Sequence, residues 1–226
     1  MTPALIIFDC DGVLVDSEMI STSVLYDLFV QYDIPIDQPT IYERFLGRSM
    51  ASMRTVLAEE YGVSMTDEHL EFVRRNMRER FMRELKPVPG VADALARLRI
   101  PLCVASSSSP ERIRLSLGVT GLIDFLEPNI FSATMVKNGK PAPDLFLHAA
   151  REMGVAPARC VVIEDSPAGV MAAQAAKMSV FGFIGGGHAE PAGLGAALAA
   201  LGPDLIFNDM CDLPQLLASK ATKKAI

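Results

Sequence analysis

The sequence has no run of 18 strongly apolar residues, no CxxC pair and no excess of basic side chains. Without such an apolar run, no segment predicts a membrane span. The four cysteines, at positions 10, 103, 160 and 211, lie far apart in otherwise apolar segments, so we predict small buried core thiols. The formal net charge of −6 argues against a general nucleic-acid binder, because phosphate backbones are bound by clustered Lys and Arg.

The N-terminal segment has no basic leader, and two acidic residues interrupt its apolar run. This pattern predicts no signal peptide, and we expect a protein of a reducing compartment, the cytoplasm. Hydrophobic residues make up 50% of the 226 positions and charged residues 21%, which excludes disorder. A chain of this length needs no disulfide or structural metal to form a core, and it fits one α/β domain with a smaller insert.

Short apolar runs rich in β-branched residues predict strands that are buried on both faces. These runs lie at 4–8, 102–105, 160–163, 180–184 and 205–207. Helical patterns separate them at 91–98, 110–117, 143–153 and 167–176. Strands that alternate with helices of this length indicate an α/β fold, with a parallel sheet and helices on both of its faces.

The segment from 17 to 86 breaks this alternation. It predicts helices only, at 18–32, 41–45, 49–61 and 67–84, and the last of these carries five arginines that we interpret as a solvated face with i,i+4 ion pairs. A proline-rich linker at 87–90 leads back to the sheet. We therefore predict a core of residues 1–16 and 87–226, with a helical insert at 17–86. The last residues, 219–226, are predicted to form a polar, basic, frayed tail.

Two pairs of acidic residues follow predicted strands. Asp9 and Asp11 come directly after the first apolar run, and Glu164 and Asp165 close the run at 160–163. Residues i and i+2 at a strand end share a face, and open α/β sheets bind ligands at the carboxyl ends of their strands. If these strands are neighbours, up to four carboxylates converge, and each close pair repels by about 4 kcal/mol. The pattern therefore predicts a divalent cation with oxygen ligands, for which Mg²⁺ is well suited.

Serines and one lysine add groups that suit an anion. Ser106 opens a run of four serines ahead of a predicted helix, and hydroxyls with N-terminal helix amides bind anions. Ser108 or Ser109 is the predicted N-cap of that helix. Lys140 lies in the proline-stiffened segment 138–143, which would hold its ammonium group in place.

Four motifs in this order and spacing resemble the haloacid dehalogenase-like hydrolase superfamily, and more closely its β-phosphoglucomutase-like branch with a helical cap. The motifs are FDCDGVLVDS at 8–17, Ser106, GKPAPD at 139–144 and IEDS at 163–166. The resemblance spans nearly the whole chain. It implies a Rossmann-like parallel sheet core with helices on both faces, and a helical cap domain inserted after the first strand, where the pattern predicts helices only.

The resemblance also implies a catalytic role for each matching residue. Asp9 resembles the nucleophile that forms an aspartyl-phosphate, and Asp11 resembles the general acid/base. Ser106 and Lys140 resemble the residues that hold the phosphoryl oxygens, with Ser107 beside them, and Lys140 would also offset the charge on Asp9. Phosphoryl transfer depends mainly on such positioning and charge neutralisation.

The implied cofactor is Mg²⁺. Asp165 resembles a side-chain metal ligand, and Glu164 resembles its neighbour, which acts directly or through water. Asp9 completes the implied side-chain ligands, and Asp11 would contribute its backbone carbonyl. The metal ligands that we expect are therefore Asp9, Asp11, Glu164 and Asp165.

The sequence departs from these relatives in places that bear on its reaction. Phosphoglucomutases of this branch carry a histidine near the cap entrance, whereas the aligned place here holds Ser21. The histidines of the chain, at positions 69, 148 and 188, are interpreted as structural or surface residues. This departure favours hydrolysis over the mutase reaction. True haloacid dehalogenases lack the second aspartate, so the presence of Asp11 argues against dehalogenation.

We therefore expect a magnesium-dependent phosphatase that acts on a small phosphorylated metabolite, a sugar phosphate or sugar-acid phosphate. The expected protein is a monomer or weak dimer with no nucleic-acid or membrane partner. Arg48, in a segment that resembles a cap loop facing the active site, is expected to bind an anionic substrate group; the alternative is a solvated arginine. A β-phosphoglucomutase-type phosphotransferase and a catalytically idle anion-binding module remain the alternative functions.

Overall fold

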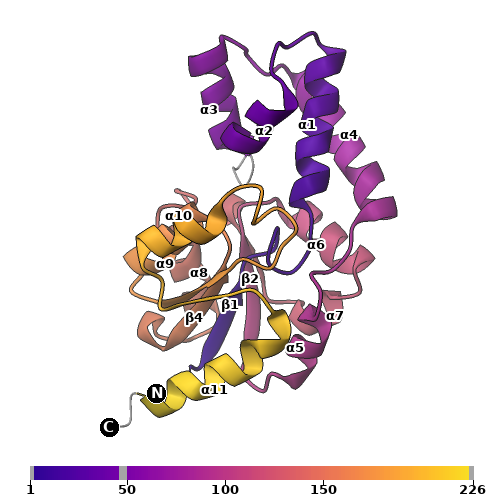
Figure 1. Cartoon of the computed structure of the whole chain (residues 1–226). Coiled ribbons are helices and arrows are strands. Elements are labelled where there is room, and N and C mark those ends of the chain that lie inside the picture. Colours follow the sequence, from indigo (N-terminus) through magenta and orange to yellow (C-terminus); the bar gives the residue numbers. More distant parts are fainter. Residues whose placement is uncertain (1–2, 46–49, 224–226) are drawn as a thin grey trace.

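The centre of the molecule is a parallel sheet of six strands in the order β3-β2-β1-β4-β5-β6 (Figure 1). The computed structural model describes residues 3–45 and 50–223. The strands are β1 (Leu5–Phe8), β2 (Leu102–Ser106), β3 (Ile130–Ser132), β4 (Cys160–Glu164), β5 (Ser179–Phe183) and β6 (Leu205–Phe207). The central strand β1 pairs Phe8 with Val104 of β2 and with Ile163 of β4. The ends of β1, β2 and β4 therefore lie next to one another.

Each face of the sheet is covered by helices because the central strands alternate their side chains between two apolar cores. Ile6 and Phe8 point into one core, whereas Leu5 and Ile7 point into the other. The first core also holds residues of α5 (Val91–Arg97), α6 (Pro110–Val119), α7 (Ile123–Leu126) and α11 (Leu213–Lys223). The second holds residues of α8 (Asp144–Glu152), α9 (Pro167–Ala175) and α10 (Leu194–Leu201). Short 3₁₀ turns span Ala133–Met135, Pro157–Arg159 and Met210–Asp212.

The helical insert stands beyond the carboxyl end of β1 (Figure 1). It consists of α1 (Glu18–Gln31), α2 (Gln38–Phe45), α3 (Met50–Tyr61) and α4 (Asp67–Glu84). Helix α4 packs against α1 and against α6 of the sheet domain. The two chain crossings lie side by side, because the Asp16 N–H donates to the Lys86 carbonyl and the Val88 N–H donates to the Leu14 carbonyl, both at 3.0 Å. These bonds lie where the sequence predicts the boundary between insert and core. The division into two domains at this boundary stays a prediction.

The fold class predicted from the sequence is confirmed, with differences at the periphery. The five predicted strands are present to within about one residue at each end, but β3, α7, α10 and α11 were not predicted. The predicted frayed tail is wrong for residues 219–223, which belong to α11. Three cysteines are buried as predicted, whereas Cys211 is exposed, and all four are free thiols. None of the described helices is both long and apolar enough to cross a membrane.

Candidate active site

Three buried carboxylates meet at the ends of β1 and β4. Asp9 follows β1, Glu164 is the last residue of β4, and Asp165 comes next. Because these strands are neighbours, one oxygen atom from each carboxylate lies within 4.8 Å of the others. The convergence that the sequence predicted for these acidic residues is therefore present in the fold.

Lys140 joins two of these carboxylates from the loop that precedes α8. Its Nζ donates to Asp9 Oδ1 at 2.6 Å and to Glu164 Oε1 at 2.5 Å, and its side chain is only 5% exposed. The Nζ also lies 4.9 Å from the ring centroid of Phe146. Burial acts to lower the pKa of Lys140, but Asp9 and Glu164 outweigh it and raise that pKa. The lysine therefore stays charged beside Asp9.

This acidic cluster suits a divalent cation, since the Lys140 ammonium group contacts only two of the three buried carboxylates. Burial raises the pKa of Asp9 well above its usual value, and the negative charges of Glu164 and Asp165 raise it further. Burial also raises the pKa of Asp165. Such repulsion is relieved by a hard cation, which prefers carboxylate oxygens as ligands. Gly12 lets the chain pass close to Asp165, because it has φ +80° and a Cβ there would overlap the Asp165 carboxylate.

Glu164 accepts hydrogen bonds from three protein donors. In addition to Lys140, the backbone N–H and the hydroxyl of Ser166 each donate to Glu164 Oε2 at 2.9 Å. Gly169 packs against the same carboxylate so closely that a Cβ at this position would overlap it. These partners fix the orientation of Glu164, which leaves Asp9 and Asp165 as the carboxylates with more freedom to bind a cation.

The side chain of Asp11 lies outside this cluster and faces a different set of donors. Ser17 Oγ and Ser108 Oγ each donate to its carboxylate at 2.6 Å, and the Arg112 guanidinium donates at 2.9 Å. Burial acts to raise the pKa of Asp11, but Arg112 and these hydrogen bonds outweigh it, so that pKa is lowered. The two aspartates of the first motif therefore have opposite electrostatic environments.

The serines after β2 complete this edge of the sheet. Ser106 is buried, and its Oγ accepts a hydrogen bond from the Ser108 N–H at 3.1 Å. Ser109 is the N-cap of α6, as one of the two alternatives predicted, and its Oγ accepts from the Arg112 N–H at 3.4 Å. Ser107 is exposed. Each of these three serines lines the same pocket as Asp9 and Lys140.

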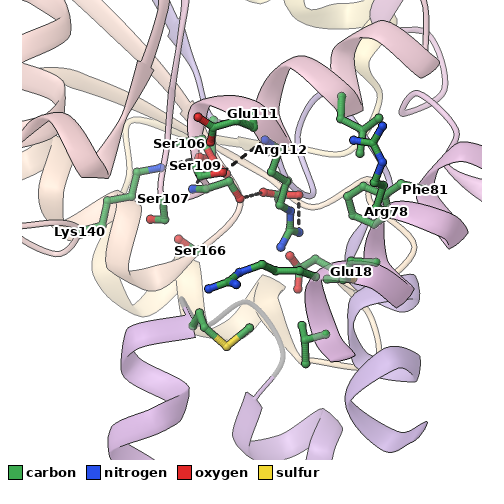
Figure 2. Close-up of a pocket in the computed structure, with 18 of the residues that line it drawn as sticks. Glu18, Arg78, Phe81, Ser106, Ser107, Ser109, Glu111, Arg112, Lys140 and Ser166 are labelled. Atoms are coloured by element: carbon green, nitrogen blue, oxygen red, sulfur yellow. Dashed lines mark hydrogen bonds and ion pairs between the residues drawn. The ribbon is translucent and has the colours of Figure 1, made fainter. Parts of the chain in front are cut away.

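This pocket has a volume of about 670 Å³ and lies between the sheet edge and the insert. Figure 2 shows Lys140 and the labelled serines on one side and Glu18, Arg78 and Phe81 on the other. The insert contributes the following lining residues: Glu18 of α1, Met50 of α3, and Val73, Arg74, Met77, Arg78 and Phe81 of α4.

The interpretation of α4 as a wholly solvated charged face is therefore wrong in part. Ion pairs do join Arg74 to Glu71 and Arg80 to Glu84, as that interpretation predicted. Arg74 and Arg78 nevertheless line the pocket, since the apolar side of α4 turns toward it. Arg48 lies outside the described residues.

Two further residues beside the predicted set escaped the sequence analysis. Arg112 of α6 contacts Asp11, and its guanidinium also lies 5.1 Å from the ring centroid of Phe81. His188 is buried and not at the surface, with Nε2 2.8 Å from Asp165 Oδ2. Burial acts to lower the pKa of His188, but Asp165 outweighs it and raises that pKa. The three glycines before His188 were the one available signal, since a Cβ at Gly186 would crowd His188 and the Gly12 carbonyl.

A family model of the haloacid dehalogenase-like hydrolases matches residues 3–177, more than half of the chain. The chain belongs to the haloacid dehalogenase-like hydrolases. This hydrolase is 37% identical to a conserved haloacid dehalogenase-like protein of unknown function from Agrobacterium tumefaciens strain C58. That structure superposes with a TM-score of 0.81 over 96% of this chain and 99% of the other.

Two characterised relatives differ in the activity that they are named for. This hydrolase is 30% identical to the 6-phosphogluconate phosphatase of Escherichia coli strain K12, over 82% of this chain and 85% of that protein. It is 31% identical to the β-phosphoglucomutase of Bacillus subtilis strain 168, over 92% of this chain and 90% of that protein. The family model and the relatives named as phosphatases show a phosphoric monoester hydrolase. The residues of the site bear on the mutase alternative.

Proposed function

We propose that this hydrolase is a magnesium-dependent phosphatase that hydrolyses a small phosphorylated metabolite, a sugar phosphate or sugar-acid phosphate, through an aspartyl-phosphate on Asp9. The observation that carries the proposal is the pairing of a buried Asp9 with Lys140, 2.6 Å away, at the base of a pocket that the serines after β2 also line. A carboxylate nucleophile next to a fixed cation is the arrangement that phosphoryl transfer needs.

In the first step, a carboxylate oxygen of Asp9 forms a bond to phosphorus while the bond from phosphorus to the ester oxygen breaks. Lys140 and Ser106 hold the phosphoryl oxygens, and Ser107 contributes at the exposed side. Asp11 supplies the proton that the departing alkoxide takes, once substrate binding has weakened the contact with Arg112 that lowers its pKa in the free protein. In the second step, water attacks phosphorus, Asp11 accepts its proton, and inorganic phosphate leaves with Asp9 restored. General acid/base groups of this kind contribute about 10² to 10⁴-fold to a rate.

Mg²⁺ would be held by Asp9 and Asp165, by Glu164 directly or through water, and by the backbone carbonyl of Asp11. When bound, it supplies positive charge that offsets the negative charge of the phosphoryl group. The four free thiols suit a reducing compartment, and we propose the cytoplasm. We expect a monomer or weak dimer, with a metabolite as its partner.

The chemistry at the start of the insert favours hydrolysis over mutase activity. At the position where the mutase branch has its histidine, Ser21 donates to the Ser17 carbonyl at 2.9 Å and lies 3.4 Å from Arg112. A hydroxyl placed in this way does not titrate near neutral pH, so it cannot replace an imidazole as an acid or base.

Hydrolysis of p-nitrophenyl phosphate by the purified protein tests this proposal. We expect turnover with Mg²⁺, loss of turnover in excess EDTA, and recovery when Mg²⁺ is restored. Turnover that EDTA leaves unchanged would contradict the metal requirement, and no turnover with any divalent cation would favour the idle anion-binding module. With β-glucose 1-phosphate, release of inorganic phosphate is expected; accumulation of glucose 6-phosphate would favour the mutase.

A further inference from the structure

The wall of the pocket opposite Lys140 is built mainly by one side of α4. Val73, Met77 and Phe81 recur at intervals of four residues, so they form one row on the helix surface. All three are buried, and all three line the pocket. Leu115 of α6 adds another apolar side chain to the lining. This wall therefore offers apolar surface to the carbon skeleton of a leaving group.

Arg74 and Arg78 form a second row on α4, and both line the pocket. Arg74 is paired with Glu71 at 3.2 Å. Among the side chains that the structure describes, by contrast, no carboxylate forms an ion pair with Arg78. The third arginine of the lining, Arg112, is committed to Asp11 at 2.9 Å. Arg78 is therefore the guanidinium of this wall whose charge is available to a ligand.

The negative side chains of the pocket have other partners or can take up a proton. Asp9 is paired with Lys140, and Asp11 with Arg112. Glu18 lines the pocket beside this wall, and burial together with the charges of Asp11 and Asp165 raises its pKa to about 7. Asp165, also part of the lining, is paired with His188 at 2.8 Å. Glu111 is exposed at the start of α6. None of these groups neutralises Arg78 by direct contact.

We propose that Arg78 is a specificity-determining residue that binds a second anionic group, a carboxylate or a phosphate, on the leaving group of the phosphate ester. The inference rests on the proposed function, because it assumes that the phosphoryl group occupies the Lys140 end of the pocket. A guanidinium pairs with either anion through two parallel N–H donors. Neutral polyols gain little from this wall, which pairs apolar side chains with a cation. The preferred substrates are then phosphate esters whose leaving group carries a carboxylate or a second phosphate.

Matched pairs of substrates test this inference. Glucose 6-phosphate and 6-phosphogluconate differ by a carboxylate, and fructose 6-phosphate and fructose 1,6-bisphosphate differ by a phosphate. The wild-type enzyme is expected to have a higher kcat/KM for the member with the second anionic group in at least one pair. The pair that shows the preference tells carboxylate from phosphate. Arg78→Gln should lower that preference by about tenfold, a difference of about 1.4 kcal/mol, mainly through KM. Arg78→Lys should recover part of it.

Arg75→Gln is the matched control, because Arg75 is an exposed arginine of the same helix that does not line the pocket. It should leave the preference unchanged. The inference is overturned if the wild-type enzyme has no preference in either pair, if Arg78→Gln lowers kcat/KM equally for both members, or if Arg75→Gln has the same effect as Arg78→Gln.

Binding to the Asp9→Asn variant separates this inference from the proposed function. Calorimetry should show that 6-phosphogluconate or fructose 1,6-bisphosphate binds more tightly than the partner that lacks the second anionic group, and that adding Arg78→Gln weakens this binding by about tenfold. This result would support Arg78 even if p-nitrophenyl phosphate were not hydrolysed, in which case the proposed function alone would fail. Equal affinity for both members of each pair would contradict the role of Arg78 whatever the activity.

Discussion

Three carboxylates within one pocket show how neighbouring groups set the chemistry of a residue. Asp9 has one ammonium partner and two acidic neighbours, and burial raises its pKa. Asp11 has an arginine and two hydroxyl donors, which lower its pKa despite burial. The pKa of Glu18 is raised from 4.5 to about 7 by burial and by the charges of Asp11 and Asp165. Within one pocket, the pKa of a carboxyl group is thus raised at Asp9 and Glu18 and lowered at Asp11.

Glu18 gives a prediction about stability and pH. The unfolded chain loses this proton near pH 4.5, whereas the folded protein keeps it to about pH 7. The folded state therefore binds more protons between these values, and its free energy of unfolding falls as pH rises through this window and is level above it. One pKa unit corresponds to about 1.4 kcal/mol, and partial exposure of Glu18 reduces the total to about 1–2 kcal/mol.

Glu18→Gln cannot ionise, so its free energy of unfolding should gain about 1–2 kcal/mol relative to the wild type between about pH 5 and about pH 8. Urea unfolding of both proteins in EDTA measures this difference. Glu59→Gln, on the exposed side of α3, is the control and should show no such gain. A difference between wild type and Glu18→Gln that stays constant across these pH values would mean that Glu18 is already ionised at the lower one.

At the residue scale, the sequence predicted the groups that belong to continuous motifs. Asp9, Glu164 and Asp165 do meet, because the ends of the adjacent parallel strands β1 and β4 lie side by side, and Lys140 reaches them from the loop before α8. The partnership of Arg112 with Asp11 was not predictable, since it joins residues 101 positions apart through the packing of α6 and no local pattern records it.

At the scale of elements, the first turn of α9 is built around Glu164. Gly169 lies in this turn, and a Cβ there would overlap the buried Glu164 carboxylate, which Lys140 and Ser166 hold in place. Gly118 of α6 is also helical, but a Cβ there would meet nothing within 4 Å. The same substitution should therefore have opposite effects at these two sites.

Gly118→Ala should stabilise the protein by about 0.5–1 kcal/mol, because alanine loses less backbone entropy in a helix than glycine does. Gly169→Ala should instead lower the melting temperature and raise the Mg²⁺ concentration needed for half-maximal activity, since Glu164 must move. Thermal unfolding and a Mg²⁺ titration of both variants measure these effects. Gly169→Ala with unchanged melting temperature and Mg²⁺ requirement would show that Glu164 is free to shift.

The predictability of each element followed its length and its environment. The central strands were predictable because burial on both faces requires continuous apolar runs. Strand β3 has only three residues, too few to show a period. Helix α4 was predicted in extent, but the side that it turns to the pocket depends on packing against α1 and α6. Its charged residues alone did not distinguish Arg78 from the solvated arginines.

At the scale of the whole molecule, the proposed function assigns chemistry and recognition to different parts of the chain. The strand ends and the loop before α8 would supply the reacting groups, and α4 of the insert lines the opposite wall of the pocket. The insert joins the sheet domain through two adjacent crossings, at Asp16 and Lys86. This arrangement lets the insert vary in sequence, and so in specificity, without disturbing Asp9 and its partners.

Transfer of the phosphoryl group to Asp9 is tested most directly by acid quenching of the enzyme during turnover of a phosphate ester that carries a radiolabelled phosphoryl group. We expect one label per chain that hydroxylamine removes, as for an acyl phosphate, on the peptide that contains Asp9. Asp9→Asn should take up no label and should lose activity by orders of magnitude while it stays folded. A label on another residue, or near-wild-type turnover by Asp9→Asn with deamidation excluded, would contradict the aspartyl-phosphate route.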